Sequence, residues 1–131
     1  MSKKILIIDD EPDVIMYLST VLKSHDYLPY AIDNAISAME KVKEIKPDLI
    51  CLDIMMPRET GITFYTRLKQ DRAYKDIPVI IVSGAVAEAD FDIKNFVDDK
   101  SIPPPDCYVE KPIDVDKFIR TIEKFVLQER R

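Results

Sequence analysis

Three acidic side chains stand where they could act on one ligand. Asp9 and Asp10 follow the apolar run 5–8, and Asp53 follows the apolar run 49–52. Each run is short and mostly branched aliphatic, which is typical of a strand buried on both faces of a parallel sheet. An open α/β sheet binds its ligands beyond the carboxyl ends of its strands, where strand order reverses. We therefore expect the three carboxylates to converge there.

Three carboxylates in one pocket repel one another. At about 4 Å and an effective dielectric constant near 20, each like-charged pair costs roughly 4 kcal/mol. A cation is needed to stabilise such a group, and an all-oxygen ligand set with open positions suits Mg²⁺ best. The cluster therefore predicts a magnesium site.

Strand-like and helix-like segments alternate along the whole chain. This alternation predicts an α/β fold, a doubly wound parallel sheet with helices on both faces. Pro29 falls inside the second expected strand. Because proline cannot donate a hydrogen bond to a ladder, this strand belongs at a sheet edge. The expected strands cover residues 5–8, 27–31, 49–52, 78–82 and 106–109.

The expected helices are marked by apolar residues at helical spacing and by their end signals. Pro12 suits a helix first turn, Asp33 or Asn34 suits the cap of the next helix, and Asp114 suits the cap of the last. Residues 102–105 contain three prolines and are expected to be extended rather than helical. The expected helices cover residues 12–22, 35–45, a segment around 64–68, 85–99 and 115–126.

Length and composition narrow the class of protein. The 131 residues predict one domain, 1–131, that is large enough for a true core. A net charge of −5 without a dense Lys/Arg run argues against direct nucleic-acid binding. No apolar stretch approaches a membrane span, and the two cysteines lie in expected strands without a disulfide or metal motif. We therefore expect a cytoplasmic protein, with its one histidine, His25, in a surface loop.

Four separated motifs occur at the ends of the expected strands. They are Asp9-Asp10-Glu11-Pro12, Asp53-Ile54-Met55-Met56-Pro57 with Gly61, Ser83 after a strand, and Lys111-Pro112 after the last strand. Together they resemble the receiver domain of two-component response regulators, over essentially the full chain. The resemblance implies a flavodoxin-like fold of five parallel strands in the order 2-1-3-4-5, which also places the Pro29 strand at an edge.

The resemblance also implies a role for each residue at the predicted site. Asp53 would be the phosphoacceptor, taking a phosphoryl group from a phosphohistidine. Asp9, Asp10, Asp53 and the backbone carbonyl of Met55 would hold Mg²⁺. Lys111 and the metal would neutralise charge on the transferring phosphoryl oxygens, the kind of electrostatic help on which most phosphoryl transfer depends.

Two further residues would form a switch by the same resemblance. The hydroxyl of Ser83 would bond a phosphoryl oxygen, and Tyr108 would change rotamer when Ser83 moves. The Lys111-Pro112 bond matches one that is commonly cis in receivers, a geometry that would direct the lysine into the pocket.

The chain also departs from the family pattern. Ser83 and Lys111 lie 28 positions apart, farther than is usual, and residues 101–105 replace a turn of small residues. Met55 and Ala85 flank the expected phosphoryl entry and carry neither an acid nor an amide. Because neither side chain would position water, we predict slow self-dephosphorylation.

The leading hypothesis is a stand-alone receiver that acts by protein–protein contact or phosphoryl relay and is not a turnover enzyme. Its partners would be a sensor histidine kinase or histidine phosphotransfer protein and a downstream target that the sequence does not name. The alternative is a binding module that works without phosphorylation through residues 85–105. A third hypothesis, a haloacid-dehalogenase-type hydrolase, requires a second acid two residues after the nucleophile, where Met55 stands.

Overall fold

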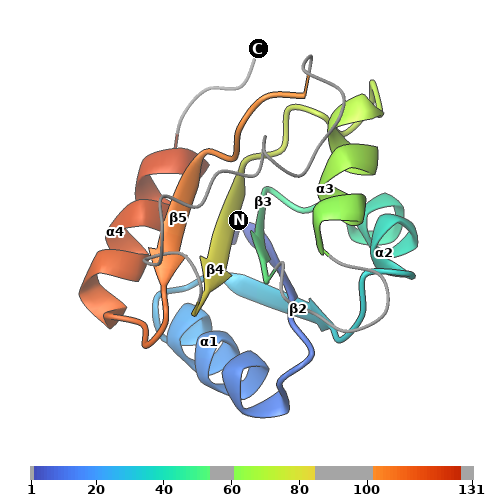
Figure 1. Cartoon of the computed structure of the whole chain (residues 1–131). Helices are drawn as coiled ribbons and strands as arrows, with labels where there is room; N and C mark the ends of the chain where they lie inside the picture. Colours follow the sequence, from blue (N-terminus) through green and yellow to red (C-terminus); the bar gives the residue numbers. More distant parts are fainter. Residues whose placement is uncertain (1, 54–60, 85–101, 128–131) are drawn as a thin grey trace.

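A five-stranded parallel sheet forms the centre of the protein, as the computed structural model shows for residues 2–53, 61–84 and 102–127 (Figure 1). The strands lie in the order β2-β1-β3-β4-β5 and every neighbouring pair is parallel. Both the order and the parallel pairing confirm the sequence prediction, and each strand lies within one residue of its expected range. The strands are β1 (Lys4–Ile8), β2 (Leu28–Ile32), β3 (Leu49–Leu52), β4 (Val79–Ser83) and β5 (Cys107–Glu110).

Helices cover both faces of the sheet (Figure 1). Successive side chains of a strand point to opposite faces, so β1 divides its residues between two apolar clusters. Leu6 and Ile8 pack with α2 and α3, whereas Ile5 and Ile7 pack with α1 and α4. The described helices are α1 (Pro12–Ser24), α2 (Ala38–Ile45), α3 (Gly61–Gln70) and α4 (Val115–Val126). The helix expected over 85–99 lies outside the described residues.

The position of β2 follows from its proline. The Leu28 N–H donates toward β1, to the Lys3 carbonyl, so the nitrogen of the next residue, Pro29, faces away from β1. No strand lies beyond β2 in the described sheet, and the missing N–H therefore interrupts no ladder. The central strands β1 and β3 are apolar and almost fully buried. The proline therefore explains which of the first three strands lies at the edge.

Two helix ends agree with the sequence and one does not. Pro12 is in the first turn of α1, and the Asp114 side chain caps α4 by accepting a hydrogen bond from the Lys117 N–H at 3.2 Å. The predicted start of α2 at residue 35 was wrong, because α2 begins at Ala38.

A side-chain hydrogen bond accounts for the late start of α2. Asn34 Oδ1 accepts from the Ser37 N–H at 2.9 Å, so the asparagine closes a turn ahead of the helix instead of capping it. Ala35 is buried in this turn and helps to fill the core without being helical. Its apolar character was correctly predicted, but its helical conformation was not.

The chain crosses from β1 to β2 on one side and then to β3 on the other. The carboxyl ends of β1 and β3 therefore flank the switch point of the sheet, where open α/β folds bind ligands. Residues 102–105 form neither helix nor strand, as their prolines predicted. Within the part of the chain described, no helix has the length and apolar character needed to span a membrane.

Candidate functional site

Strand register brings Asp9 and Asp53 side by side. Ile8 of β1 pairs with Leu52 of β3, and each aspartate is the next residue of its chain segment. The Asp53 N–H donates to the Ile8 carbonyl at 2.9 Å, and the Asp9 N–H donates to the Ile32 carbonyl at 3.2 Å. Both carboxylates therefore project from backbone that the sheet still holds.

Four acidic side chains form a cluster at this edge. Carboxylate oxygens of Asp9, Asp10, Glu11 and Asp53 all lie within 4.8 Å of one another. Asp9 is only 2% exposed and Asp53 only 4%, so water screens their mutual repulsion poorly. The three aspartates were predicted to converge here from the sequence, and the structure brings them together.

Lys111, which directly follows β5, supplies a positive charge to the cluster. Its ammonium lies 3.1 Å from Asp9 Oδ2, 3.1 Å from Glu11 Oε1 and 3.5 Å from Asp53 Oδ2. The peptide bond that follows it, Lys111-Pro112, is cis, as the resemblance implied. One lysine thus contacts three of the four acids.

At both Asp9 and Lys111, burial and hydrogen bonding shift the pKa in opposite directions. Burial raises the pKa of Asp9 above its usual value, and the charge of Asp53 adds to this effect. The Glu11 N–H and Lys111 act in the other direction. Burial by itself would lower the pKa of Lys111, but its hydrogen bonds to Asp9 and Glu11 and the charge of Asp53 outweigh it and raise the pKa. Lys111 therefore stays charged, whereas the ionised form of Asp9 is disfavoured by its burial.

Glu11 is a member of the site that the sequence reasoning did not assign. It occupies the cap position of α1, yet its side chain makes no capping hydrogen bond and reaches Lys111 instead. Its N–H donates to Asp9 Oδ1 at 2.9 Å, which holds the Asp9 carboxylate in place. Three consecutive acids at residues 9–11 were the signal that could have identified it.

The other predicted residues have different surroundings. Ser83 ends β4 at the same edge of the sheet and pairs with Glu110 of β5. Tyr108 lies in β5, is partly buried and packs on the α2–α3 side of the sheet. Met55 lies outside the described residues. His25 follows α1 on the surface, with Nδ1 3.0 Å from the Val21 carbonyl, as expected of a loop histidine.

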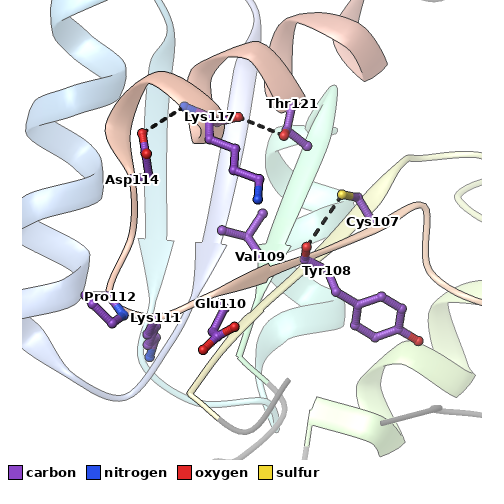
Figure 2. Close-up of a pocket in the computed structure, with 9 residues that line it drawn as sticks. All are labelled: Cys107, Tyr108, Val109, Glu110, Lys111, Pro112, Asp114, Lys117 and Thr121. Carbon is purple, nitrogen blue, oxygen red and sulfur yellow. Dashed lines mark hydrogen bonds between the residues drawn. The ribbon is translucent and has the colours of Figure 1, made fainter. Parts of the chain in front are cut away.

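A separate cavity lies next to the acidic cluster. Figure 2 shows the residues that line it, which come from β5, α4 and the connection between them and include Lys117 and Thr121. The cavity has a volume of about 380 Å³. Lys111 lines this cavity, whereas none of the four acids does. The ring of Tyr108 points away from this cavity, toward the face of the sheet that α2 and α3 cover (Figure 2).

The donor set of the acidic cluster fits Mg²⁺. Every group offered is a carboxylate oxygen, and neither cysteine belongs to the cluster. Two acids are buried and two are more exposed, which leaves positions for water or for a phosphoryl group. Asp9, Asp10 and Asp53 are the residues that would hold the ion, with Glu11 within reach.

Comparison with known proteins gives one consistent result. The sequence profile of the family described as response regulator receiver domain matches residues 5–123. The chain is 30% identical over 128 residues to the polar-differentiation response regulator DivK of Brucella anthropi, covering 96% of this chain and 98% of that one.

Solved structures of similar fold agree with this match. The receiver domain of the sensor histidine kinase PA1611 from Pseudomonas aeruginosa superposes with a TM-score of 0.82 at 16% identity, covering 98% of this chain and all of that one. The chemotaxis protein CheY4 of Vibrio cholerae gives 0.80 at 19% identity, covering 95% and 99% of the two chains. At these identities the likeness establishes the flavodoxin-like fold.

Proposed function

Because this chain belongs to the family of response regulator receiver domains, we propose that it is a stand-alone receiver that accepts a phosphoryl group on Asp53. The observation that supports this most directly is the shared contact of Lys111 with the buried Asp9 and Asp53 carboxylates. A buried acid pair with one fixed cation and an all-oxygen donor set suits phosphoryl transfer. The chain aligns over 98% of the length of the DivK relative, which supports its comparison with that response regulator as a whole.

In this proposal, a carboxylate oxygen of Asp53 attacks the phosphorus of a phosphohistidine. The new O–P bond forms as the P–N bond breaks, and the electron pair returns to the imidazole of the donor protein. Asp53 is fixed by its backbone hydrogen bond to Ile8, so little reorganisation is needed to present its oxygen. The Lys111 ammonium lies 3.5 Å from Asp53 Oδ2, so it is placed to neutralise the negative charge on the phosphoryl oxygens during transfer.

The metal site is part of the same proposal. Asp9, Asp10 and Asp53, with the backbone carbonyl of Met55, would hold Mg²⁺, and a bound Mg²⁺ supplies charge neutralisation to the acids and the phosphoryl oxygens. The PA1611 receiver has a magnesium ion coordinated in its active site cleft, which supports the same assignment here. Glu11 would help to return Lys111 toward the acids after transfer, because it contacts the same ammonium.

Ser83 and Tyr108 complete the proposed mechanism as a switch. Ser83, at the end of β4, would donate its hydroxyl to a phosphoryl oxygen, and Tyr108 would then change rotamer. Tyr108 is partly buried, so a change of its rotamer would not have to move a fully enclosed side chain. The switch would convert a charge change at Asp53 into a change of surface shape.

The proposed partners follow from this chemistry. A sensor histidine kinase or a histidine phosphotransfer protein donates the phosphoryl group, and a downstream protein reads the switch by direct contact. Members of this family are signalling proteins and not classical turnover enzymes. A cytoplasmic location is proposed with them, and two free cysteines are in keeping with a reducing compartment.

The competing function is a module that binds partners through residues 85–105 without phosphorylation. The intact acid cluster with its lysine disfavours it, because a pure binding module has no use for buried like charges. The two functions predict different outcomes with a phosphodonor.

The test is incubation with acetyl phosphate and Mg²⁺, followed by intact mass measurement. We expect a gain of one phosphoryl group that requires Mg²⁺ and is abolished in Asp53→Asn. Asp26→Asn, which removes an exposed charge outside the cluster, is the matched control and should label like the native protein. Absence of labelling in the native protein would favour the binding module.

The same preparation tests phosphoryl lifetime. With methionine at 55 and alanine at 85, no side chain at either position would aid the attacking water, and we expect slow loss of the label after the donor is removed. A half-life of seconds in the presence of Mg²⁺ would contradict this prediction.

A further inference from the structure

The segment before β5, residues 102–106, is fastened to the fold along its length, and we call it the strap. Ile102 is 3% exposed and sits in the α2–α3 cluster. At the other end, Asp106 pairs with Val79 of β4 twice: its N–H donates to the Val79 carbonyl at 3.0 Å, and its Oδ2 accepts from the Val79 N–H at 2.8 Å. The strap therefore lies on the protein as an ordered element.

A buried tyrosine of α3 holds the middle of the strap. Tyr65 is fully buried, and its hydroxyl donates to the Pro103 carbonyl at 2.6 Å. Burial raises the pKa of this hydroxyl most, and the nearby Asp106 and Tyr108 raise it further, so it remains a protonated donor. The bond joins residues 38 positions apart.

Lys69, one turn along α3, secures the neighbouring connection in a similar way. Its ammonium donates to the carbonyls of Lys75 and Ile77 at 2.9 and 3.0 Å and stands 5.7 Å above the Tyr65 ring. The chain ahead of β4 and the chain ahead of β5 are thus both tied to one face of α3. Tyr65, which is fully buried and lies under the Lys69 ammonium, is therefore held in place where it bonds the strap.

The strap is stiff and ends next to Tyr108. Three consecutive prolines fix φ over residues 103–105, and only Asp106 and Cys107 separate them from Tyr108. The Tyr108 ring packs against the cluster that contains both Tyr65 and Ile102. A shift of the strap therefore reaches Tyr108 through the backbone and through its packing.

We propose that Tyr65 is a positioning residue for Tyr108: by holding Pro103 it sets the place of the strap and, through the strap, the rotamer of Tyr108. The assignment of Tyr108 as a phosphorylation switch rests on the proposed function, whereas its control by Tyr65 is a property of the unphosphorylated protein. Because coupling between two groups is reciprocal, a change of Tyr108 rotamer on phosphorylation would in turn loosen the Tyr65–Pro103 contact.

The test uses the full chain labelled with 3-fluorotyrosine and observed by fluorine NMR. The six tyrosines give six signals, and Tyr108→Phe identifies that of Tyr108. Tyr65→Phe removes only the hydroxyl. We expect the Tyr108 signal to shift or split in Tyr65→Phe, and the Asp106 amide to exchange with solvent about fivefold faster.

Tyr30→Phe is the matched control, since Tyr30 packs against the same cluster from the edge strand β2. It should leave the Tyr108 signal in place. A Tyr65→Phe protein with faster exchange but an unmoved Tyr108 signal would reduce Tyr65 to a structural fastening and overturn the proposal. If Tyr65→Phe does not fold, Ile102→Val loosens the strap from its other end, and the same shift of Tyr108 is required.

Addition of beryllium fluoride with Mg²⁺ separates this proposal from the proposed function. Beryllium fluoride mimics a phosphoryl group on a carboxylate, and it should move the Tyr108 signal in the native protein. A Tyr108 signal that does not move when beryllium fluoride is added would contradict the phosphorylation switch. The comparison of Tyr65→Phe with Tyr30→Phe, made without the mimic, decides the role of Tyr65 by itself.

Discussion

Substitution of Asp9 by asparagine should stabilise the protein without metal and weaken it with metal. At an effective dielectric constant near 20, the attraction of Asp9 to Lys111 across 3.1 Å is about 5 kcal/mol. Repulsion from Asp53 within 4.8 Å is about 3 to 4 kcal/mol, and the two other acids add to it. The repulsion from the other acids therefore at least offsets the attraction to Lys111, and burial is the largest cause of the raised pKa of Asp9.

Asparagine removes the charge but can still accept the hydrogen bond from the Glu11 N–H. We therefore expect the free energy of unfolding at pH 7 in EDTA to rise by about 1 kcal/mol. For a domain of this size the melting temperature should rise by roughly 4 °C. With Mg²⁺ at a hundred times its dissociation constant, the native protein gains about 2.7 kcal/mol, whereas the variant gains little. The order of stabilities should then reverse.

The pH dependence of this difference has a definite sign. When the pKa of an acid is higher in the folded state than in the unfolded state, the folded protein loses stability as the pH rises from the lower pKa through the higher one. The native protein should therefore fall behind Asp9→Asn between acidic and neutral pH and match it below the ordinary pKa of 3.8, where both states are protonated. Urea unfolding in EDTA and in Mg²⁺, with Asp26→Asn as charge control, measures these effects. An Asp9→Asn protein less stable than native in EDTA, or equally responsive to Mg²⁺, would refute the reasoning.

Three further predictions concern individual side chains outside this comparison. Lys111→Met leaves the acids without their cation and should destabilise the metal-free protein by roughly 2 kcal/mol in urea unfolding at pH 7; an unchanged midpoint would contradict the assigned ion pairs. Burial raises the pKa of Cys51 to about 12, so iodoacetamide at pH 8 should label Cys107 and leave Cys51 unmodified in the native state, and labelling of both by mass spectrometry would be inconsistent with the core described. Asp114→Ala removes the cap of α4 and should cost about 1 kcal/mol by thermal unfolding, whereas Asp114→Asn should cost less; equal losses would argue against capping.

The sheet was predictable because its strands differ sharply from their surroundings. Buried parallel strands read as continuous apolar runs, and Pro29 forced one of them to an edge. The acids at residues 9, 10 and 53 could be grouped because parallel strands end at a common edge. The start of α2 was missed because Asn34 has two uses, a helix cap or a separate turn, and only the tertiary fold chooses between them.

The contacts that depend on side-chain reach were not predictable from sequence. Glu11 could be read as a cap of α1, and nothing local shows that it extends to Lys111, 100 residues away. The bond from Tyr65 to Pro103 joins a helix to a segment whose prolines indicated only an extended chain. Both contacts arise where the fold brings distant segments together, which sequence spacing does not encode.

Chemical trapping of the phosphorylated residue tests the central claim most directly. Borohydride reduces an acyl phosphate to an alcohol, so an aspartyl phosphate becomes homoserine and the phosphate leaves. After treatment with acetyl phosphate and Mg²⁺, reduction and digestion, peptide mass spectrometry should find homoserine at position 53 and at no other acid. An alcohol at another carboxylate of the cluster, or none at all, would contradict the account.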